Sequence, residues 1–336
     1  MPHTAHAITL AARPKGQPQL SDFATTTRDL PAPGPGQVLV RIQWLSLDPY
    51  MRGRMDDAKS YAAPVPLGGT MEGEAVGQVI ASGSPDFGAG DTVIGPFGWC
   101  DQALADAATL RRVDPGHAEV QTALGVLGMP GLTAWVGLND IANAQPGETI
   151  VVSAATGAVG SVVGQVAKAK GLRVIGVAGG PEKCAYAVEI LGYDACLDHR
   201  APDLAAQMAG TAPEIDIYFE NTGGATLLAV LPQMKVGGRI AVIGAIAWYS
   251  GQNADQALPL PAVWRMILTR RLRVQGMIVF DHNHRRPAFL AEVAPMLANG
   301  TLINRESVAT GLDAAPKAFI DMLKGGNLGK QLVRVG

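Results

Sequence analysis

The sequence contains few cysteines, and those it has are far apart. Cys100, Cys184 and Cys196 are the three cysteines in 336 residues. A zinc site made of four closely spaced cysteines is therefore excluded, and so is a disulfide framework of the kind found in small secreted domains. We expect a protein of a reducing compartment, the cytoplasm.

Long apolar runs and an excess of one charge are also missing. No apolar run reaches about 18 residues, the length that a membrane-spanning helix needs. The formal net charge is -2, so no basic surface for nucleic acid is indicated. The first residues lack the charged start and apolar core of a signal peptide. We therefore expect neither a membrane nor a nucleic acid among the partners.

The length and the 48% hydrophobic content are enough for two domains with sizeable cores. Up to about residue 120, short apolar runs separated by Pro and Gly predict strands, for example over 37–44 and 73–82. A helical pattern follows over 123–143, broken by Met129-Pro-Gly131. Later strand-like segments alternate with helical stretches, which predicts a doubly wound parallel sheet. These segments cover 195–197, 215–220, 239–244 and 273–280.

The C-terminal part of the sequence shows an amphipathic helix followed by a strand. The helical pattern covers 314–324, and the strand pattern covers 330–335. We expect this last strand to return to the N-terminal β domain.

The most informative segment is a strand, a glycine-rich turn and a helix start over 149–164. Its turn has the spacing of the dinucleotide fingerprint, with Ala155 in the first glycine position. A second strand over 172–178 completes a βαβ unit of the expected length. We predict that the turn and the helix N-terminus hold a pyrophosphate. The predicted contacts are Ala155, Thr156, Gly157, Ala158, Val159 and Gly160.

The residues after the second strand indicate which dinucleotide binds. NAD-specific sites place an acid there for the ribose hydroxyls, whereas this sequence has Ala178-Gly-Gly-Pro181. Lys183 lies at the start of the next helix, and a helix N-terminus with a lysine suits the 2′-phosphate of NADP. We predict NADP, with contacts from Gly180 and Lys183. The alternative is that Lys183 is an ordinary solvated helix residue.

Several motifs together resemble one enzyme group. They span most of the chain: Asp48-Pro-Tyr-Met-Arg52, Gly128-Met-Pro-Gly-Leu-Thr-Ala134, Ala154-Ala-Thr-Gly-Ala-Val-Gly160, Tyr218-Phe-Glu-Asn-Thr-Gly-Gly224 and Asn327-Leu-Gly-Lys330. The sequence resembles the zinc-independent, NADP-dependent double-bond reductases of the medium-chain dehydrogenase/reductase superfamily. That group includes prostaglandin reductases, plant alkenal reductases and bacterial curcumin reductase.

The resemblance implies an α/β fold with two domains. A Rossmann-type domain with a doubly wound parallel sheet is expected over 124–299. A GroES-like, β-rich catalytic domain, a partly open barrel, is expected over 1–123 and 300–336.

No metal is expected in this protein. The zinc enzymes of the superfamily take a histidine ligand from a Gly-His-Glu motif. The corresponding stretch here is Glu72-Gly73-Glu74, with Gly73 where the histidine would stand. His282 and His284 are close in sequence, but a pair two residues apart in a loop is usually solvated. The chemistry must therefore proceed without a zinc ion.

The resemblance implies that NADPH reduces the C=C bond of α,β-unsaturated aldehydes and ketones. Hydride would reach the β-carbon while a tyrosine stabilises the enolate and supplies the proton. The candidate catalytic residues are Tyr249, beyond the strand over 239–244, and Tyr50, from the β domain. A phenol is protonated at neutral pH, as a donor must be. The alternative for each is a packed tyrosine that never contacts substrate.

Further contacts are carried over from the group. The remaining cofactor candidates are Thr133, His199, Asn221, Gly244, Ala245, Ile246, Met277, Val279 and Asn327. His199 stands where mammalian members have a tyrosine; it would stack on the cofactor, pair with its phosphate when protonated, or be solvated. The substrate candidates are Tyr50, Met51, Trp248 and Tyr249, which suit an apolar enal or enone. Trp44 and Trp99 are further candidates for the same pocket, with core packing as the alternative.

Two other functions stay open from the sequence. One is a zinc-free NADPH quinone oxidoreductase, and the other is an NADPH-binding protein without catalysis. The resemblance also implies a homodimer in which the strand over 273–280 pairs across a two-fold axis.

Overall fold

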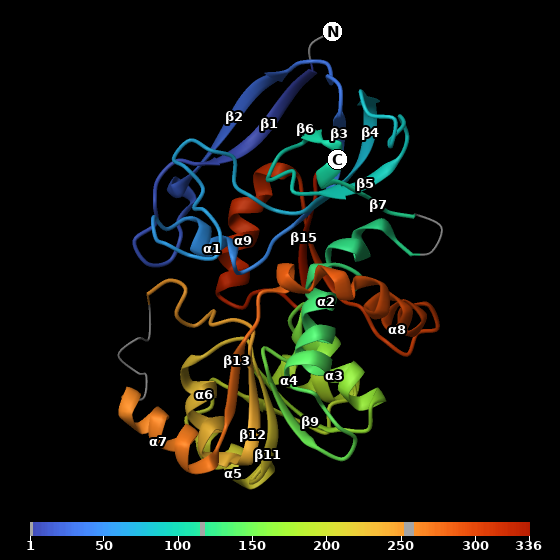
Figure 1. The fold of residues 1–336 in the computed structure, drawn as a ribbon. Coiled ribbons are helices and arrows are strands. Elements are labelled where there is room, and N and C mark those ends of the chain that lie inside the picture. Colours follow the sequence, from blue (N-terminus) through green and yellow to red (C-terminus); the bar gives the residue numbers. More distant parts are fainter. Residues whose placement is uncertain (1–2, 115–117, 252–258) are drawn as a thin grey trace. The chain divides into compact units, whose positions relative to one another are not determined.

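The computed structural model describes residues 3–114, 118–251 and 259–336 and divides into two compact units (Figure 1). The first comprises 1–125 and 306–336, and the second comprises 126–305. We call them the β-rich unit and the nucleotide unit. Each has hydrophobic clusters of its own.

The β-rich unit is built on a mostly antiparallel sheet with the order β14-β15-β3-β4-β5-β7, and β6 pairs with β3. Its strands are β3 (Gln37–Ser46), β4 (Ala75–Ser82), β5 (Thr92–Gly95), β6 (Gln102–Asp106), β7 (Arg111–Arg112), β14 (Glu306–Thr310) and β15 (Lys330–Arg334). A separate pair is formed by β1 (His3–Leu10) and β2 (Phe23–Leu30), and the helices are α1 (Met51–Arg54) and α9 (Ala315–Leu323). Strand β15 pairs antiparallel with β3, which confirms the predicted return of the C-terminal strand.

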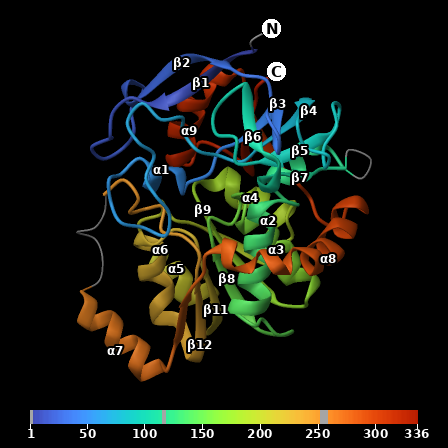
Figure 2. The same cartoon turned by 45° about the horizontal axis from the view of Figure 1, so that its top comes forward.

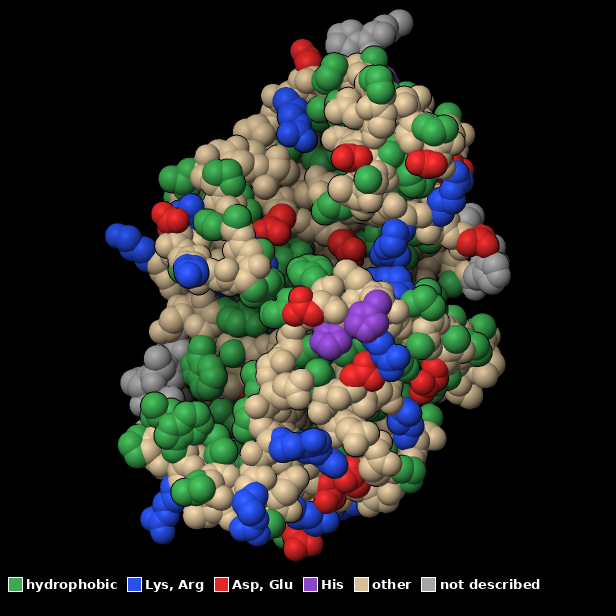
Figure 3. All heavy atoms as spheres, viewed as in Figure 1, with side chains coloured by type: hydrophobic (Ala, Val, Ile, Leu, Met, Phe, Trp, Pro, Cys, Tyr) green, Lys and Arg blue, Asp and Glu red, His purple; other side chains and the backbone are tan. Residues whose placement is uncertain are grey.

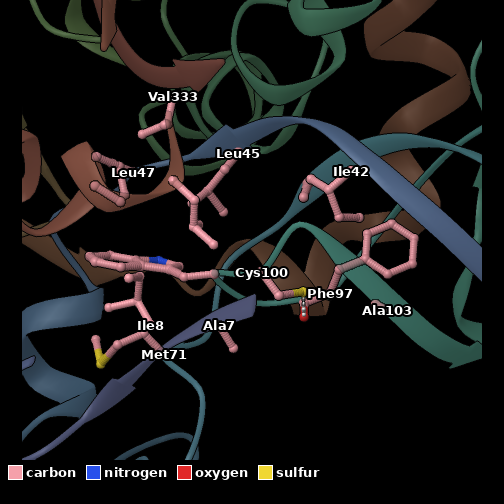
Figure 4. Packing of buried hydrophobic residues seen from close by; sticks show 14 of the residues in the cluster. Ala7, Ile8, Ile42, Leu45, Leu47, Met71, Phe97, Cys100, Ala103 and Val333 are labelled. Carbon is pink, nitrogen blue, oxygen red and sulfur yellow. Dashed lines mark hydrogen bonds between the residues drawn. The ribbon is translucent and has the colours of Figure 1, made fainter. Parts of the chain in front are cut away.

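The core of the β-rich unit joins residues from both ends of the chain. Figure 4 shows Leu45 and Leu47, which come from the N-terminal part, beside Val333 of β15. Trp99 is fully buried among them, with its ring stacked 5.7 Å from Phe23. Trp99 is therefore a core residue and does not line a substrate pocket.

The nucleotide unit contains, among the described residues, a six-stranded sheet whose neighbouring strands are all parallel. The strand order is β10-β9-β8-β11-β12-β13. The strands are β8 (Thr149–Ser153), β9 (Arg173–Ala178), β10 (Ala195–Asp198), β11 (Ile215–Glu220), β12 (Met234–Val242) and β13 (Arg273–Gly276). From β8 the chain runs outward to β9 and β10, then crosses to β11 on the other side. Such a switch point is where ligands bind, beyond the carboxyl ends of the strands.

Helices cover both faces of this sheet, so the doubly wound parallel sheet is confirmed (Figure 2). Residues of α2 (Met129–Val136), α3 (Gly160–Ala169) and α8 (Arg286–Ala298) share one hydrophobic cluster with the strands. Residues of α5 (Leu204–Thr211), α6 (Gly224–Val230) and α7 (Leu260–Arg270) share the cluster of the opposite face. Helix α4 (Pro181–Glu189) packs on β9 and β10.

Two predicted elements differ from the structure. Met129-Pro-Gly131 does not break a helix but begins α2, because proline in a first turn loses no helical hydrogen bond. The strand predicted over 273–280 ends at Gly276, and Val279–Arg285 forms a 3-10 helix. The partner strand β12 ends at Val242, which pairs with Gly276. Beyond Gly276, β13 therefore has no residue of β12 to pair with.

The described helices include none that combines the length and the apolar character needed to cross a membrane.

Candidate cofactor and active site

The glycine-rich turn leads directly from β8 into the N-terminus of α3. Ala154 adopts a left-handed conformation, with φ of 50°, and Ala155 is fully buried, donating its N–H to Val177 O at 3.0 Å. Gly157 closes the turn with a bond to Ala154 O at 2.9 Å. This geometry presents the first turn of α3 at the carboxyl edge of the sheet, where its N–H groups suit a phosphate.

Gly160 of the fingerprint and Gly164, one turn further along α3, make room for close packing. A Cβ on Gly160 would lie 2.3 Å from Ala154 O, so the helix start approaches the turn itself. A Cβ on Gly164 would lie 2.1 Å from the ring of Tyr193. Tyr193 donates its hydroxyl to Gly160 O at 2.7 Å. Gly164 thus leaves room for the Tyr193 ring, and the Tyr193 hydroxyl stabilises the turn. The sequence pattern alone did not indicate this role of Tyr193.

The end of β9 carries a compact basic cluster. Asp198 Oδ1 accepts the backbone N–H groups of Gly180 at 2.8 Å and of Arg200 at 2.9 Å. A Cβ on Gly179 would lie 2.8 Å from His199 Nε2 and 3.3 Å from a guanidinium nitrogen of Arg200. The structure therefore gathers His199 and Arg200 at the turn over Gly179–Gly180.

Lys183, in the first turn of α4, belongs to the same cluster. Burial, and then the positive charge of Arg200, lower the pKa of Lys183. Burial and Arg200 likewise lower the pKa of His199 below its ordinary 6.5, so this histidine is neutral at pH 7. Of the roles expected for His199, this charge state disfavours pairing with the phosphate and leaves stacking or solvation. Lys183 and Arg200 are the cations of the cluster, and a bound anion would offset their repulsion.

Arg200 was missed by sequence reasoning. A usable signal existed, because Arg200 follows Asp198 at the carboxyl end of β10, the strand beside β9. Carboxyl ends of parallel neighbours meet at one sheet edge, so a basic residue there lies near the turn after β9.

A second network joins the carboxyl ends of β8 and β11. Asn221 donates its backbone N–H to Ser153 Oγ at 2.8 Å and its side-chain amide to Ser153 O at 2.7 Å. Glu220, 4% exposed, accepts from Ser153 Oγ at 3.1 Å and from the N–H groups of Thr222 and Gly223. These bonds fix both the backbone and the side-chain amide of Asn221. Glu220 supports the same network, and sequence reasoning missed it.

An apolar pocket of about 390 Å³ lies beyond the carboxyl ends of β12 and β13. Its lining residues are Val242, Ile243, Gly244, Ala245, Tyr249, Gly276, Met277, Ile278 and Asp281. Four predicted site residues, Gly244, Ala245, Tyr249 and Met277, thus share one pocket within the nucleotide unit.

The hydroxyl of Tyr249 has a defined orientation in this pocket. Tyr249 Oη accepts the backbone N–H of Ala245 at 3.2 Å. A Cβ on Gly244 would lie 3.2 Å from that oxygen and 3.0 Å from Asn221 O, so only glycine leaves this approach open. Because the oxygen accepts from the backbone, the phenolic proton is available for a substrate atom.

Four other predicted site residues of the nucleotide unit are not among the residues that line this pocket: Ile246, Trp248, Thr133 and Val279. Ile246 donates its N–H to Asn221 O at 3.4 Å. Gly223 has φ of +71°, and a Cβ on it would lie 2.6 Å from the ring of Trp248. Thr133 is buried in α2, where its hydroxyl donates to Met129 O at 2.8 Å. Val279 begins the 3-10 helix after β13.

The remaining candidates belong to the β-rich unit. Tyr50 is half-buried at the start of α1, and burial, followed by the charges of Asp48, Glu72 and Glu74 and by Tyr61, raises its pKa well above 10. Its phenol is therefore protonated over the physiological range. Asn327 lies before β15 and donates to Gly329 O at 2.8 Å.

Met51 is fully buried in the core of the β-rich unit, and its sulfur accepts from the N–H of Asp48 at 3.5 Å. The structure therefore places Met51 in the core that supports the Tyr50 segment, and not on a pocket wall.

The position of the missing zinc ligand is tightly packed. A Cβ on Gly73 would lie 3.0 Å from Met51 Cε and 3.3 Å from Ser46 O, so a larger side chain there requires its neighbours to shift. Burial raises the pKa of the Cys100 thiol to about 12, which opposes the thiolate that a metal requires. Within 3–114, 118–251 and 259–336, no three His, Cys, Asp or Glu side chains form a metal-binding group.

Comparison with known proteins agrees with this geometry. Residues 6–113 match the family described as the N-terminal domain of oxidoreductase, and residues 158–295 match the family described as zinc-binding dehydrogenase. The chain is 46% identical to an NADPH-dependent curcumin reductase of Escherichia coli (strain K12), over 97% of this chain and 95% of the relative. It belongs to the zinc-independent, NADP-dependent medium-chain dehydrogenase/reductases.

Two further relatives of this family cover nearly the whole chain. A 2-alkenal reductase (NADP(+)-dependent) of Nicotiana tabacum is 39% identical, over 95% of this chain and 94% of the relative. The crystal structure of CurA from Vibrio vulnificus in complex with NADPH superposes with a TM-score of 0.93 at 45% identity, covering 98% of this chain and 99% of CurA. The chain is thus a medium-chain reductase along its full length.

Proposed function

We propose that this protein uses NADPH to reduce the C=C bond of α,β-unsaturated aldehydes and ketones. The observation that carries the proposal is the Tyr249 hydroxyl, held by the N–H of Ala245 in an apolar pocket at the carboxyl edge of the parallel sheet. The alkenal-reducing and NADPH-binding relatives support the same reaction.

The residues of the nucleotide unit fit NADPH. The glycine turn over Ala155–Gly160 and the N-terminus of α3 would hold the pyrophosphate. Lys183 and Arg200 would take the 2′-phosphate, whose negative charge offsets their repulsion. Asn221 and the backbone around Gly244 and Met277 would contact the nicotinamide end. When bound, NADPH supplies the hydride for the substrate's β-carbon.

The chain itself must stabilise the charge that develops on the substrate. As the β-carbon accepts a hydride, negative charge moves to the carbonyl oxygen, and a positioned donor lowers the barrier. The hydroxyl of Tyr249 provides this donor, and its proton is then available for the α-carbon of the enolate. Tyr50 is the second proposed donor, and its raised pKa keeps the phenol protonated. The apolar lining favours an apolar enal or enone.

A parallel substrate series tests the proposal. NADPH oxidation is followed with a medium-chain 2-alkenal, a cyclic enone and a quinone at equal concentrations. We expect turnover with the alkenal and the enone. Turnover with the quinone alone would favour a quinone oxidoreductase, and no turnover with any acceptor would favour a non-catalytic NADPH-binding protein.

We also propose that the protein is a homodimer formed through β13 and α7. Strand β13 is the outer strand of its sheet, and Val274 is 46% exposed. On α7, Trp264 and Leu268 are 62% and 76% exposed. In Figure 3 apolar side chains gather at the lower left, where Figure 1 labels α7. An open strand edge beside an apolar helix is suited to pairing with a second copy.

The dimer is tested by a double substitution on α7. We expect the wild-type protein to sediment as a dimer and the Trp264→Glu/Leu268→Glu variant as a monomer, because charge on this surface opposes its burial. Analytical ultracentrifugation measures both, and the variant Leu20→Glu, at a 59% exposed site of the β-rich unit, is the control. A wild-type monomer, or a double variant that stays dimeric, would refute this interface.

The state of the cysteines supports a reducing compartment. Cys100, Cys184 and Cys196 are all free, and Cys100 is buried. We propose the cytoplasm as the location on this ground.

A further inference from the structure

The β-rich unit contains a buried ion pair next to a candidate site residue. Lys330, at the start of β15, places Nζ 2.5 Å from Asp48 Oδ1, with side chains 3% and 7% exposed. The same ammonium donates to Leu47 O at 2.8 Å. Ser46 donates its hydroxyl to Asp48 Oδ2. The ammonium of Lys330 and the carboxylate of Asp48 therefore bond to each other, and each has one further partner on the segment over 46–48.

The stem of Lys330 is also enclosed. A Cβ on Gly125 would lie 3.3 Å from Lys330 Cγ, so the side chain runs along the glycine backbone. Burying two charges carries a large desolvation cost, and two apolar residues would fill the same volume at less cost. Stability alone therefore gives no reason for an ion pair here.

The pair ties the segment before Tyr50 to the C-terminal strand. Leu47 donates its N–H to Gln331 O at 3.2 Å, beside the two bonds of Lys330. Figure 4 shows Leu47 and Val333 on the same side of the core. From Asp48 only Pro49, whose φ is fixed by its ring, separates the anchor from Tyr50. The backbone between the ion pair and Tyr50 is therefore short and partly constrained.

The groups facing Tyr50 include several charges. Asp48, Glu72 and Glu74 act on it electrostatically, and so does Tyr61. The guanidinium carbon of Arg54 lies 5.6 Å from the centre of its ring. A displaced segment would change the distance of the phenol from each of them.

We propose that the buried Asp48–Lys330 ion pair positions Tyr50 for its contact with substrate by tying the Leu47–Tyr50 segment to β15. This role rests on the proposed function, in which Tyr50 contacts the enone.

The first test is a double-mutant cycle. We expect Lys330→Met to raise KM for the enone and lower kcat/KM about 10- to 100-fold, while KM for NADPH changes less than about twofold. In a Tyr50→Phe background, the same substitution should cause no further loss, because the pair acts through the phenol. Asp48→Asn, which keeps the shape of the side chain, should give the same pattern with a smaller loss.

A core variant separates positioning from general destabilisation. Leu30→Ala opens a cavity in a separate hydrophobic cluster of the same unit that contains no residue of this segment, so it should lower Tm and leave the enone KM unchanged. Equal losses of kcat/KM from Lys330→Met in the wild-type and Tyr50→Phe backgrounds would overturn the positioning role, while enone turnover itself would stand.

A second readout does not depend on turnover. Protein labelled with 3-fluorotyrosine gives one ¹⁹F resonance that is absent from Tyr50→Phe and so belongs to Tyr50. We expect this resonance to shift or broaden in Lys330→Met and Asp48→Asn, and to stay in place in Leu30→Ala. An unchanged Tyr50 resonance in both pair variants would overturn the inference, even for a protein that reduced no enone.

Discussion

Replacing Tyr249 with phenylalanine is expected to lower kcat for enone reduction by about 100- to 1,000-fold. Among the described residues that line the pocket, Tyr249 is the one whose side chain carries a hydroxyl donor. The backbone N–H of Ala245 fixes the position of its oxygen. Loss of this hydroxyl removes stabilisation of the charge on the substrate oxygen at the transition state. The ring stays, so the apolar wall and the backbone around Gly244 are kept.

The effect should fall on kcat and leave cofactor binding intact. NADPH affinity, measured by the fluorescence of the bound reduced nicotinamide, should change by less than about twofold, because the cofactor contacts come from backbone and from other residues. Tyr186→Phe, on α4 of the same unit and outside the pocket, is the matched control and should keep wild-type kcat. A Tyr249→Phe enzyme with full kcat would remove the donor assignment.

The second large effect is expected on cofactor choice. Lys183→Ala and Arg200→Ala should each raise the dissociation constant for NADPH about 10- to 100-fold, since each removes a charged hydrogen bond to the 2′-phosphate. Affinity for NADH, which lacks that phosphate, should stay level or rise. Isothermal titration with the two cofactors measures the ratio directly. Arg173→Ala, at the opposite end of β9, is the control and should leave the ratio unchanged.

The same cluster predicts a pH dependence. The pKa of Lys183 lies below 10.5, so its charge is lost as pH rises through that lowered value. NADPH affinity should therefore fall at alkaline pH while NADH affinity stays level. In Lys183→Ala the alkaline fall should disappear. If both cofactors lost affinity in parallel, the fall would not come from the 2′-phosphate.

The nucleotide unit was largely predictable from sequence because its signals are local. The fingerprint over Ala155–Gly160 is contiguous, and β11 spans the predicted 215–220. Strand β13 ends at Gly276 and not at the predicted Phe280, because its partner β12 ends at Val242. The length of β13 is thus set by its neighbour in the sheet. Local patterns carry no information about where a neighbouring strand ends.

The parts of the site that were missed depend on contacts between distant residues. Arg200 reaches the Gly179 turn only because β10 lies beside β9. Lys330 meets Asp48 across 282 positions of sequence. Met51 resembled a pocket residue, but the return of β15 closes a core over it. Such placements follow from topology, which the motif spacing does not encode.

One measurement tests the central claim most directly: product analysis after reaction of an acyclic enone with NADPH deuterated at C4, in ordinary water. If Tyr249 serves hydride transfer to a C=C bond, mass spectrometry and NMR should show the saturated ketone with deuterium at the β-carbon and a solvent-derived proton at the α-carbon. Deuterium on the hydroxyl-bearing carbon of an allylic alcohol, formed by hydride addition to the carbonyl, would contradict the account, and so would recovery of unreacted enone.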